Sequence, residues 1–327
     1  MDGAASGAGA ADAGETSSIA DASRSDSEVG TDAGSAPPAP FAATYFIGTD
    51  ISRVQTDPPA TLYTDNDGTQ KDLLVLLKGH GFNYIRVRTF ADPRAADGNS
   101  KTAGFYDIPH TVTFGKRIKD ASMGFLLDFH YSDNWADPGK QCVPIAWQGF
   151  TTIADLATAV HDYTKDAITG AVSNWNNLGA LLRAAAQGIK DVDTGIKIMI
   201  HLDKAQDFAT SRAFITNAIA QKVPFDVFGE SSYTLYQGPP SGWQSTFTQL
   251  AAAFPNLKFV SAEYGPDERA INDIIFGLPN QQGIGTFYWE ATHSGADNAG
   301  ALLFSNRAAQ PDLLLYDAMK TAYASRL

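Results

Sequence analysis

The fold is decided by a stretch in which a buried strand runs directly into polar residues, Phe125-Leu126-Leu127-Asp128-Phe129-His130. Similar short runs, each rich in large apolar or β-branched residues, recur at 45–48, 84–88, 196–201, 225–229, 258–263 and 285–290. Polar loops and helical patterns, such as 71–79 and 153–168, lie between these runs. Because strands alternate with helices, the pattern predicts a parallel sheet.

Polar or charged side chains stand at or just past the end of the predicted strands. They are Asp50, Arg86, Arg88, Asp128, His130, His201, Asp203, Glu230, Glu263 and Glu290. In a (β/α) barrel the carboxyl ends of the strands form the active-site rim, whereas a doubly wound sheet gathers its ligands at one switch point. The chain also has no Gly-rich phosphate loop. We therefore predict an α/β fold, a (β/α)8 barrel of the TIM type.

The spacing of the strands has one irregularity. Successive strand starts lie about 26 to 42 residues apart, but about 70 residues separate the runs that begin at Phe125 and Ile196. Two helical patterns, 153–168 and 177–190, occupy this interval. We expect the barrel to lack its fourth strand, and a short degenerate strand within 167–172 is the alternative.

The N-terminal segment differs in composition from the rest of the chain. Residues 1–40 consist mainly of Ala, Gly, Ser and Asp, with seven acidic residues and one basic residue, Arg24. Such a segment buries too little apolar surface to offset its chain entropy, and its charge favours an extended state. We predict a disordered acidic tether over 1–40, serving as a spacer at a cell surface or as a plain disordered end, and one barrel domain over 41–327.

Composition excludes several classes of function. The formal net charge of -12 argues against nucleic acid or an anionic membrane as a partner, and a neutral polymer fits better. No apolar run reaches the ~18 residues of a membrane span, and no signal peptide is present in this chain. The single cysteine, Cys142, excludes an intramolecular disulfide and a cysteine metal cluster, and we expect it to be buried. We expect a monomer.

Several motifs resemble the endo-β-1,4-galactanases of glycoside hydrolase family 53. They are Asp50-Ile51-Ser52, Tyr84-Ile85-Arg86-Val87-Arg88, the long stretch 126–138, Phe225-Asp226-Val227-Phe228-Gly229, Ala262-Glu263-Tyr264 and Tyr288-Trp289-Glu290. The resemblance covers nearly all of 44–327. It implies a secreted, extracellular or surface-tethered retaining hydrolase that cleaves inside β-1,4-linked galactan or arabinogalactan of pectin. Its two catalytic glutamates would end strands four and seven.

Glu263 is the candidate nucleophile. It ends an apolar strand, and a retaining glycosidase needs two carboxyl groups about 5–5.5 Å apart. Arg86 and Arg88 alternate on one strand and so share a face. The family places the arginine at the second position near the nucleophile, where its charge would keep a carboxylate ionised. The alternative is that Glu263 is only a structural partner of an arginine.

The second carboxyl group is missing from the pattern. No glutamate occurs between Glu28 and Glu230, and the Asn-Glu pair that the family carries on strand four is absent. Ala291 and Asp297 also replace a proline and a tryptophan that are usual in the family. Glu230 and Glu290 end the two strands that flank Glu263, so either could approach it. For Glu230 we favour a binding or structural role over that of the acid.

The remaining candidates would bind substrate. Aromatic faces stack on sugar rings, while carboxylates and imidazoles bond their hydroxyls. The predicted substrate-binding residues are Asp50, Arg86, Arg88, Asp128, His130, Trp135, His201, Asp203, Glu230, Tyr233, Trp289 and Glu290. We predict no cofactor and no zinc site at His130 and His201. Calcium at the loop with His293, Asp297 and Asn298 is an alternative, because some bacterial relatives hold calcium there.

Three functions compete at this point. The first is a galactan hydrolase whose activity is impaired by the missing acid/base segment. The second is a non-catalytic glycan-binding barrel. The third, a metal-dependent hydrolase or isomerase, is disfavoured because the sequence offers no clustered ligand set.

Overall fold

The computed structural model describes residues 44–58, 60–136, 140, 142–164, 175–292 and 302–327. Seven strands form its main sheet: β1 (Phe46–Asp50), β4 (Tyr84–Phe90), β5 (Gly124–His130), β6 (Met199–Leu202), β7 (Val227–Ser232), β8 (Lys258–Tyr264) and β9 (Gly283–Tyr288). The apolar runs of the sequence, at 45–48, 84–88, 125–130, 196–201, 225–229, 258–263 and 285–290, predicted strands beginning near 44, 83, 124, 196, 225, 257 and 283. All seven are confirmed, and β6 begins latest relative to its prediction.

The strands follow the order β5-β4-β1-β9-β8-β7-β6, and every neighbouring pair is parallel. Along the chain, β1 is the first and β9 the last strand of this sheet, and these two strands pair with each other. The sheet therefore curls round on itself as in a (β/α)8 barrel. Its free edges are β5 and β6, and no strand lies between them in the described part of the chain. The fourth strand, which we expected to be missing, would lie between β5 and β6. The alternative, a short strand within 167–172, lies outside the described residues.

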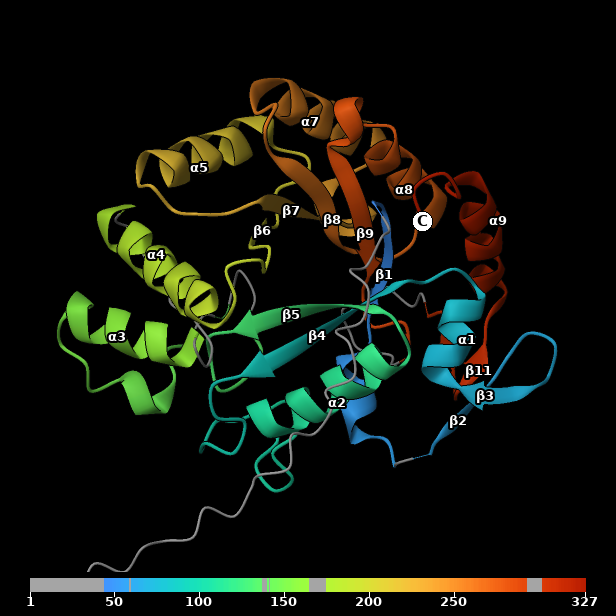
Figure 1. Ribbon diagram of the computed structural model, residues 1–327, viewed down its shortest axis with the longest axis horizontal. Coiled ribbons are helices and arrows are strands. Elements are labelled where there is room, and N and C mark those ends of the chain that lie inside the picture. The colour runs from blue at the N-terminus through green and yellow to red at the C-terminus, as the bar shows by residue number, and fades with distance from the viewer. Residues whose placement is uncertain (1–43, 59, 137–139, 141, 165–174, 293–301) are drawn as a thin grey trace, which may run out of the picture. The chain divides into compact units, whose positions relative to one another are not determined.

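Helices lie around the outside of the strands (Figure 1). They are α1 (Leu73–Gly79), α2 (Ile108–Asp120), α3 (Ile153–Thr164), α4 (Trp175–Val192), α5 (Phe208–Ala220), α6 (Thr234–Gln237), α7 (Pro240–Ala253), α8 (Glu268–Phe276) and α9 (Leu315–Ala322). Between β5 and β6 along the chain, α3 and α4 pack against each other. None of the described helices has the length and apolar character to cross a membrane.

Aspartates begin several of these helices. The side chains of Asp72, Asp107 and Asp207 each accept a hydrogen bond from a backbone N–H in the first turn of α1, α2 and α5. These N–H groups have no partner within the helix, so a carboxylate cap stabilises the first turn. The caps fix where each helix starts after its strand and loop.

A second, small sheet was not predicted. Its strands are β2 (Leu62–Thr64), β3 (Gln70–Asp72), β10 (Phe304–Ser305) and β11 (Ala308–Ala309), in the order β10-β11-β2-β3. Short 3-10 turns complete the chain: η1 (Ser52–Thr56), η2 (Ile145–Trp147), η3 (Pro279–Gln281) and η5 (Pro311–Leu314). Cys142 was also predicted wrongly, because it is exposed in the loop before η2.

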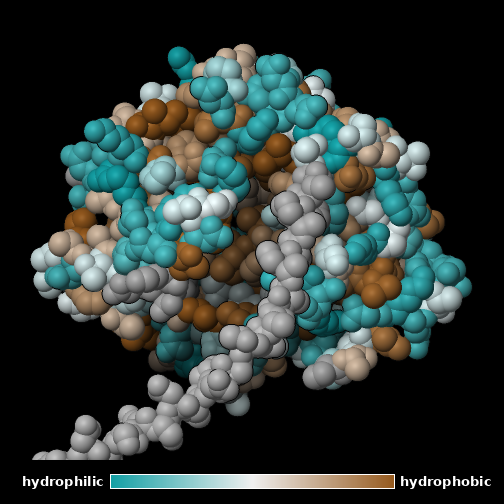
Figure 2. Space-filling model, in the orientation of Figure 1, coloured by the Kyte–Doolittle hydropathy of each residue, from teal (hydrophilic) through white to brown (hydrophobic). Residues whose placement is uncertain are grey.

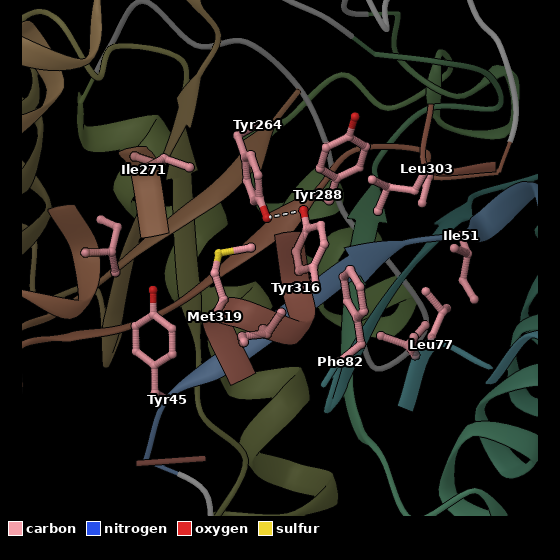
Figure 3. Close-up of a cluster of buried hydrophobic side chains, with 14 of the residues drawn as sticks. Tyr45, Ile51, Leu77, Phe82, Tyr264, Ile271, Tyr288, Leu303, Tyr316 and Met319 are labelled. Atoms are coloured by element: carbon pink, nitrogen blue, oxygen red, sulfur yellow. Dashed lines mark hydrogen bonds between the residues drawn. The ribbon is translucent and has the colours of Figure 1, made fainter. Parts of the chain in front are cut away.

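The core between the sheet and the C-terminal helices contains a buried hydrogen-bond network, of which Figure 3 shows the link between Tyr264 and Tyr316. The hydroxyl groups of Tyr264 and Tyr316 lie 2.8 Å apart, and Asn272 Nδ2 donates to Tyr264 Oη at 3.2 Å. Tyr45 Oη in turn donates to Asn272 Oδ1 at 3.2 Å. All four side chains are fully buried, so each hydrogen bond avoids the cost of an unpaired polar group. The network ties β8 to α8 and η5-α9, behind the candidate site.

Figure 2 shows the surface in the same orientation, with hydrophobic residues in the middle of this face and hydrophilic residues around much of its periphery. The tether predicted for residues 1–40 lies outside the described residues, and the boundary at residue 41 stays a prediction. The same is true of the calcium loop, because His293, Asp297 and Asn298 are not described.

Candidate active site

Glu263, near the carboxyl end of β8, stands at the centre of the candidate site. Arg86 Nη1 donates a hydrogen bond to Glu263 Oε1 at 2.8 Å, and Ser231 Oγ donates to Glu263 Oε2 at 3.2 Å. The Glu263 side chain is 18% exposed. The expected ion pair with an arginine of the second predicted strand is therefore present. Since its partners come from β4 and β7, the side chain faces the inside of the curled sheet.

Arg86 links two carboxylates. Its Nη2 lies 2.7 Å from Asp128 Oδ2, while Nη1 holds Glu263, and the guanidinium is almost fully buried. Burial alone would lower the pKa of Arg86, but Asp128, Glu263 and Asp50 raise it above its ordinary value. Burial raises the pKa of Asp128 and of Glu263, but the positive charge of Arg86 outweighs this effect, so both pKa values lie below their ordinary range. Glu263 is therefore an anion at neutral pH, as a nucleophile must be.

Arg88 is enclosed by a different set of side chains. Its Nη2 lies 3.2 Å from Asp50 Oδ1 and also contacts Glu290 Oε1. Its guanidinium carbon lies 4.2 Å from the ring centroid of Trp135 and 4.1 Å from that of Trp289, within cation–π range of both. Arg88 is fully buried. It therefore fixes the two indoles that were predicted to contact substrate.

Backbone geometry supports this cluster. Asp50 Oδ1 accepts hydrogen bonds from Ser52 N at 2.9 Å and Ser52 Oγ at 2.7 Å, which turns the chain at the end of β1. Glu290 has a φ of 48°, a conformation that costs free energy in a residue with a side chain. This conformation accompanies its contact with Arg88 and an approach of 3.7 Å to Arg53 Nε. Arg53 was not among the predicted residues.

His130 and Asp128 come from the same strand, β5. His130 Nε2 lies 3.2 Å from Asp128 Oδ2, while His130 Nδ1 accepts a hydrogen bond from Ala136 N at 3.2 Å. This pairing favours the tautomer with the proton on Nε2. The imidazole also lies edge-on to Trp135, with ring centroids 5.8 Å apart. His130 thus connects the Arg86 group to the tryptophan pair.

His201, on the edge strand β6, reaches Glu263 from another side. Its Nδ1 lies 4.0 Å from Glu263 Oε1, and its Nε2 lies 2.8 Å from Ser231 Oγ. Burial lowers the pKa of His201, more than Glu263 raises it. Because Ser231 donates to Glu263, its oxygen accepts from His201 Nε2, which leaves Nδ1 unprotonated in the neutral imidazole. Ser231 was missed from the sequence because serine carries no charge to single it out.

Asp203 and Tyr233 lie nearby but are not shown in contact with Glu263. Asp203 follows β6 and pairs with Lys204 Nζ at 3.1 Å. Tyr233 follows β7, and its ring lies 6.0 Å from that of Tyr236. Burial, and then the charge of Glu263, raise the pKa of the Tyr233 phenol well above its ordinary value. The Tyr233 phenol is thus neutral at pH 7.

Glu230 is placed differently from the other acidic candidates. Its Oε1 accepts from Ser211 Oγ of α5 at 2.5 Å, and its Oε2 accepts from Lys204 N at 2.8 Å. The side chain is fully buried, and burial raises its pKa to about 8 despite these hydrogen bonds. Its partners belong to α5 and the loop before it, so the carboxyl group points to the helix layer. The structure does not bring Glu230 together with Glu263.

Metal ligands do not gather in the described residues. Among them no group of three His, Cys, Asp or Glu side chains is placed to hold a metal ion. His130 and His201 instead make the hydrogen bonds described above.

Comparisons with known sequences give a consistent relationship. The sequence model of glycosyl hydrolase family 53 matches residues 46–172 and 168–267. The two matched segments meet within 168–172, in the interval where the fourth strand was expected. An arabinogalactan endo-beta-1,4-galactanase of Thermothelomyces thermophilus is 28% identical over 325 residues, covering 81% of this chain and 94% of that protein. The endo-beta-1,4-galactanase of Bacillus subtilis is 27% identical over 301 residues, covering 75% and 70%.

Another relative, an uncharacterized protein in the bgaB 5' region of Niallia circulans, is 32% identical over 245 residues. That match covers 64% of each chain, so this chain spans less than two thirds of that relative. Among solved structures, the family 53 catalytic domain of Ignisphaera aggregans has a TM-score of 0.74 at 25% identity, covering 86% of this chain and 97% of that one. A fungal beta-1,4-galactanase has a TM-score of 0.72 at 26% identity, covering 84% and 99%.

Fold and site together define a (β/α)-barrel glycosidase whose carboxylates and arginines meet at the carboxyl ends of the strands. The family match covers more than half of the chain, and the relatives and solved structures agree with it. The chain belongs to glycoside hydrolase family 53.

Proposed function

We propose that this chain is a retaining hydrolase of β-1,4-galactosidic bonds in galactan or arabinogalactan, with Glu263 as nucleophile and with polymer turnover impaired. The observation that carries the proposal is the ionised Glu263 held at 2.8 Å by buried Arg86. The galactanase names of the relatives point to the substrate. A polymeric substrate and the acidic segment 1–40 fit an extracellular or surface-tethered monomer.

In the first step, Glu263 attacks the anomeric carbon of a galactose unit, and the bond to the leaving oxygen breaks. The product is a glycosyl ester on Glu263. Water then attacks the same carbon and loses a proton to the solvent, the ester bond breaks with its electron pair returning to the Glu263 carboxylate, and the sugar leaves with its original configuration. Arg86 and Ser231 hold the two carboxylate oxygens, so Glu263 is oriented before the substrate arrives.

The leaving sugar needs a proton, and the described carboxyl groups near the site are engaged elsewhere. Asp128 is bound by Arg86 and His130, and Asp203 pairs with Lys204. Asp50 and Glu290 surround Arg88, and Glu230 points to α5. General acid catalysis contributes roughly 10²–10⁴-fold, so galactan turnover is expected to be lower by at least that factor.

Substrate binding would fall to the side chains around this centre. Trp135 is half-buried and would offer aromatic surface for a galactose ring, while Trp289 is buried beside it and would support its position. Hydrogen bonds to the sugar would come from Tyr233, His130, His201 and Asp203. These roles are inferred from the chemistry of the side chains and from their position around Glu263.

Reducing-sugar release from β-1,4-galactan, with an aryl β-galactoside assayed in parallel, tests the proposal. An aryl oxide leaves without a proton, so we expect the aryl substrate to be cleaved relatively better than the polymer. Glu263→Gln should abolish both activities. The missing acid also favours a non-catalytic glycan-binding barrel. That alternative holds if galactan binds while neither substrate is cleaved.

A further inference from the structure

We infer that Asp133 is a positioning residue, whose buried carboxylate joins two loops at the rim and thereby holds Trp135 where a galactan chain would bind. The inference rests on the proposed function, because it takes Trp135 as a surface for a galactose ring. Trp135 follows Asp133 by two residues in the chain, in the loop after β5. The other loop follows β4 and begins at Ala91.

The carboxylate of Asp133 accepts a hydrogen bond on each of its oxygens. Asp92 N, in the loop after β4, donates to Oδ1 at 3.0 Å, and Ile145 N donates to Oδ2 at 2.8 Å. Ile145 is the first residue of η2, so the second bond supplies a partner for an N–H group at the start of a helical turn. Because Asp133 is 2% exposed, water cannot readily replace either bond.

Further hydrogen bonds join the same two loops on either side of this carboxylate. Asn99 N, in the loop after β4, donates to the backbone oxygen of Asp133 at 3.0 Å. Asn134 Nδ2 donates to the backbone oxygen of Asp97 at 2.8 Å, while Asn134 Oδ1 accepts from Trp135 N at 2.8 Å. The main chain that leads to Trp135 is thus tied to the loop after β4.

The indole of Trp135 is connected to the nucleophile through other side chains. Its ring lies edge-on to that of His130, with centroids 5.8 Å apart. His130 Nε2 lies 3.2 Å from Asp128 Oδ2, and Arg86 binds both Asp128 and Glu263. A sugar on Trp135 would therefore be a neighbour of the galactose unit that Glu263 attacks. The position of Trp135 then matters more for a galactan chain than for a single galactose.

The chemistry of the Asp133 carboxylate makes this arrangement sensitive to one substitution. Burial raises the pKa of Asp133 above its ordinary value. The N–H groups of Ile145 and Asp92 oppose this increase, and the charges of Asp97 and Asp92 add to it. The two N–H groups thus stabilise the charged form. An asparagine would keep one acceptor oxygen but turn an NH2 donor toward the other N–H, so one of the two bonds would be lost.

The test compares the full chain with Asp133→Asn, and with Asp97→Asn as the matched control, since Asp97 is an exposed carboxylate in the facing loop. Calorimetry gives the Kd for β-1,4-galactotetraose, and an aryl β-galactoside gives kcat. We expect Asp133→Asn to raise Kd roughly tenfold, the effect of one hydrogen bond to a charged group. The change in kcat should be smaller than the change in Kd. Asp97→Asn should leave both constants unchanged.

A second variant removes one partner of the carboxylate instead. Ile145→Pro deletes the N–H that donates to Asp133 Oδ2, and proline is tolerated at the first position of a helical turn. It should also raise the Kd for galactotetraose. Because Asp133 acts through Trp135, Asp133→Asn should add little to the loss that Trp135→Ala causes alone.

Circular dichroism shows which variants are folded, and if Asp133→Asn is not, Ile145→Pro decides by the same criterion. Wild-type Kd in the folded variants, an equal loss in Asp97→Asn, or a loss that adds fully to that of Trp135→Ala would overturn the inference alone. So would a wild type that cleaves the aryl galactoside but does not bind galactotetraose. A wild type that binds galactotetraose but cleaves neither substrate overturns only the proposed function, because Kd still tests Asp133. Absence of both binding and cleavage overturns both.

Discussion

Arg86 Nη1 lies 2.8 Å from Glu263 Oε1, although β4 and β8 are separated in the sheet by β1 and β9. The contact therefore crosses the inside of the curled sheet. It couples the shape of the barrel to the charge of the nucleophile, because a barrel that opens further would pull the guanidinium away from the carboxylate.

Replacement of Glu263 by glutamine should reduce the cleavage of an aryl β-galactoside to the uncatalysed rate, because an amide cannot form the ester. Circular dichroism and the thermal midpoint control for folding. Asp120→Asn is the matched control, since Asp120 is exposed at the end of α2, and it should leave the rate unchanged. Substantial activity in Glu263→Gln would contradict the assignment.

Replacement of Arg86 by lysine should shift the acid limb of the pH–rate profile to higher pH. Arg86 lowers the pKa of Glu263 and Asp128, and a lysine cannot bond both carboxylates in the same bidentate way. Because lysine keeps the positive charge, the expected shift is smaller than the ~1 pH unit at the low end of what a whole opposite charge produces. An unshifted limb would show that another group sets the charge of Glu263.

Replacement of Arg88 by methionine should lower the free energy of unfolding by about 3–5 kcal/mol, since it removes the nearest cation from two buried carboxylates, Asp50 and Glu290. The control is Arg269→Met, which removes an exposed ion pair with Asp273 and should cost no more than ~1 kcal/mol. Urea denaturation measures both. Equal losses in the two variants would refute the view that Arg88 supports the site.

Glu230 should make the protein less stable as pH rises. Its folded pKa of about 8 lies above the ordinary value of 4.5, so the folded state binds the proton more tightly. Stability is therefore full below about pH 4.5 and falls as pH rises toward 8, by at most about 5 kcal/mol at ~1.36 kcal/mol per pKa unit. Glu230→Gln should flatten this slope in urea titrations at pH 5 and 8, and should change aryl galactoside cleavage little. A slope that persists in the variant would contradict the assignment.

Most of the architecture could be predicted from the sequence because hydrophobic strands leave a strong local signal. The run at 125–130 has the composition of a buried parallel strand, and it forms β5 as expected. The small sheet could not be predicted, because β10 and β11 are two residues long each and depend on contacts with β2. Cys142 was misjudged because burial of a loop residue is set by the path of the loop.

In the candidate site, too, some features could be predicted from the sequence and others could not. Glu263 near the end of β8 and the arginine pair on β4 allowed an ion pair with Arg86 or Arg88 to be predicted. The orientation of Glu230 could not be foreseen, because it follows from a register shift between Glu230 and Ser231 and from the position of Ser211 in α5. Ser231 became visible only through its hydrogen bonds to His201 and Glu263.

The central claim is that Glu263 acts as nucleophile without a positioned acid. The most direct measurement is the rate of cleavage of a series of aryl β-galactosides that differ only in the pKa of the leaving phenol. Without an acid, charge builds on the leaving oxygen, so we predict that the rate falls steeply as that pKa rises, with galactan the slowest substrate. A rate that is independent of the leaving group, together with efficient galactan hydrolysis, would contradict the account.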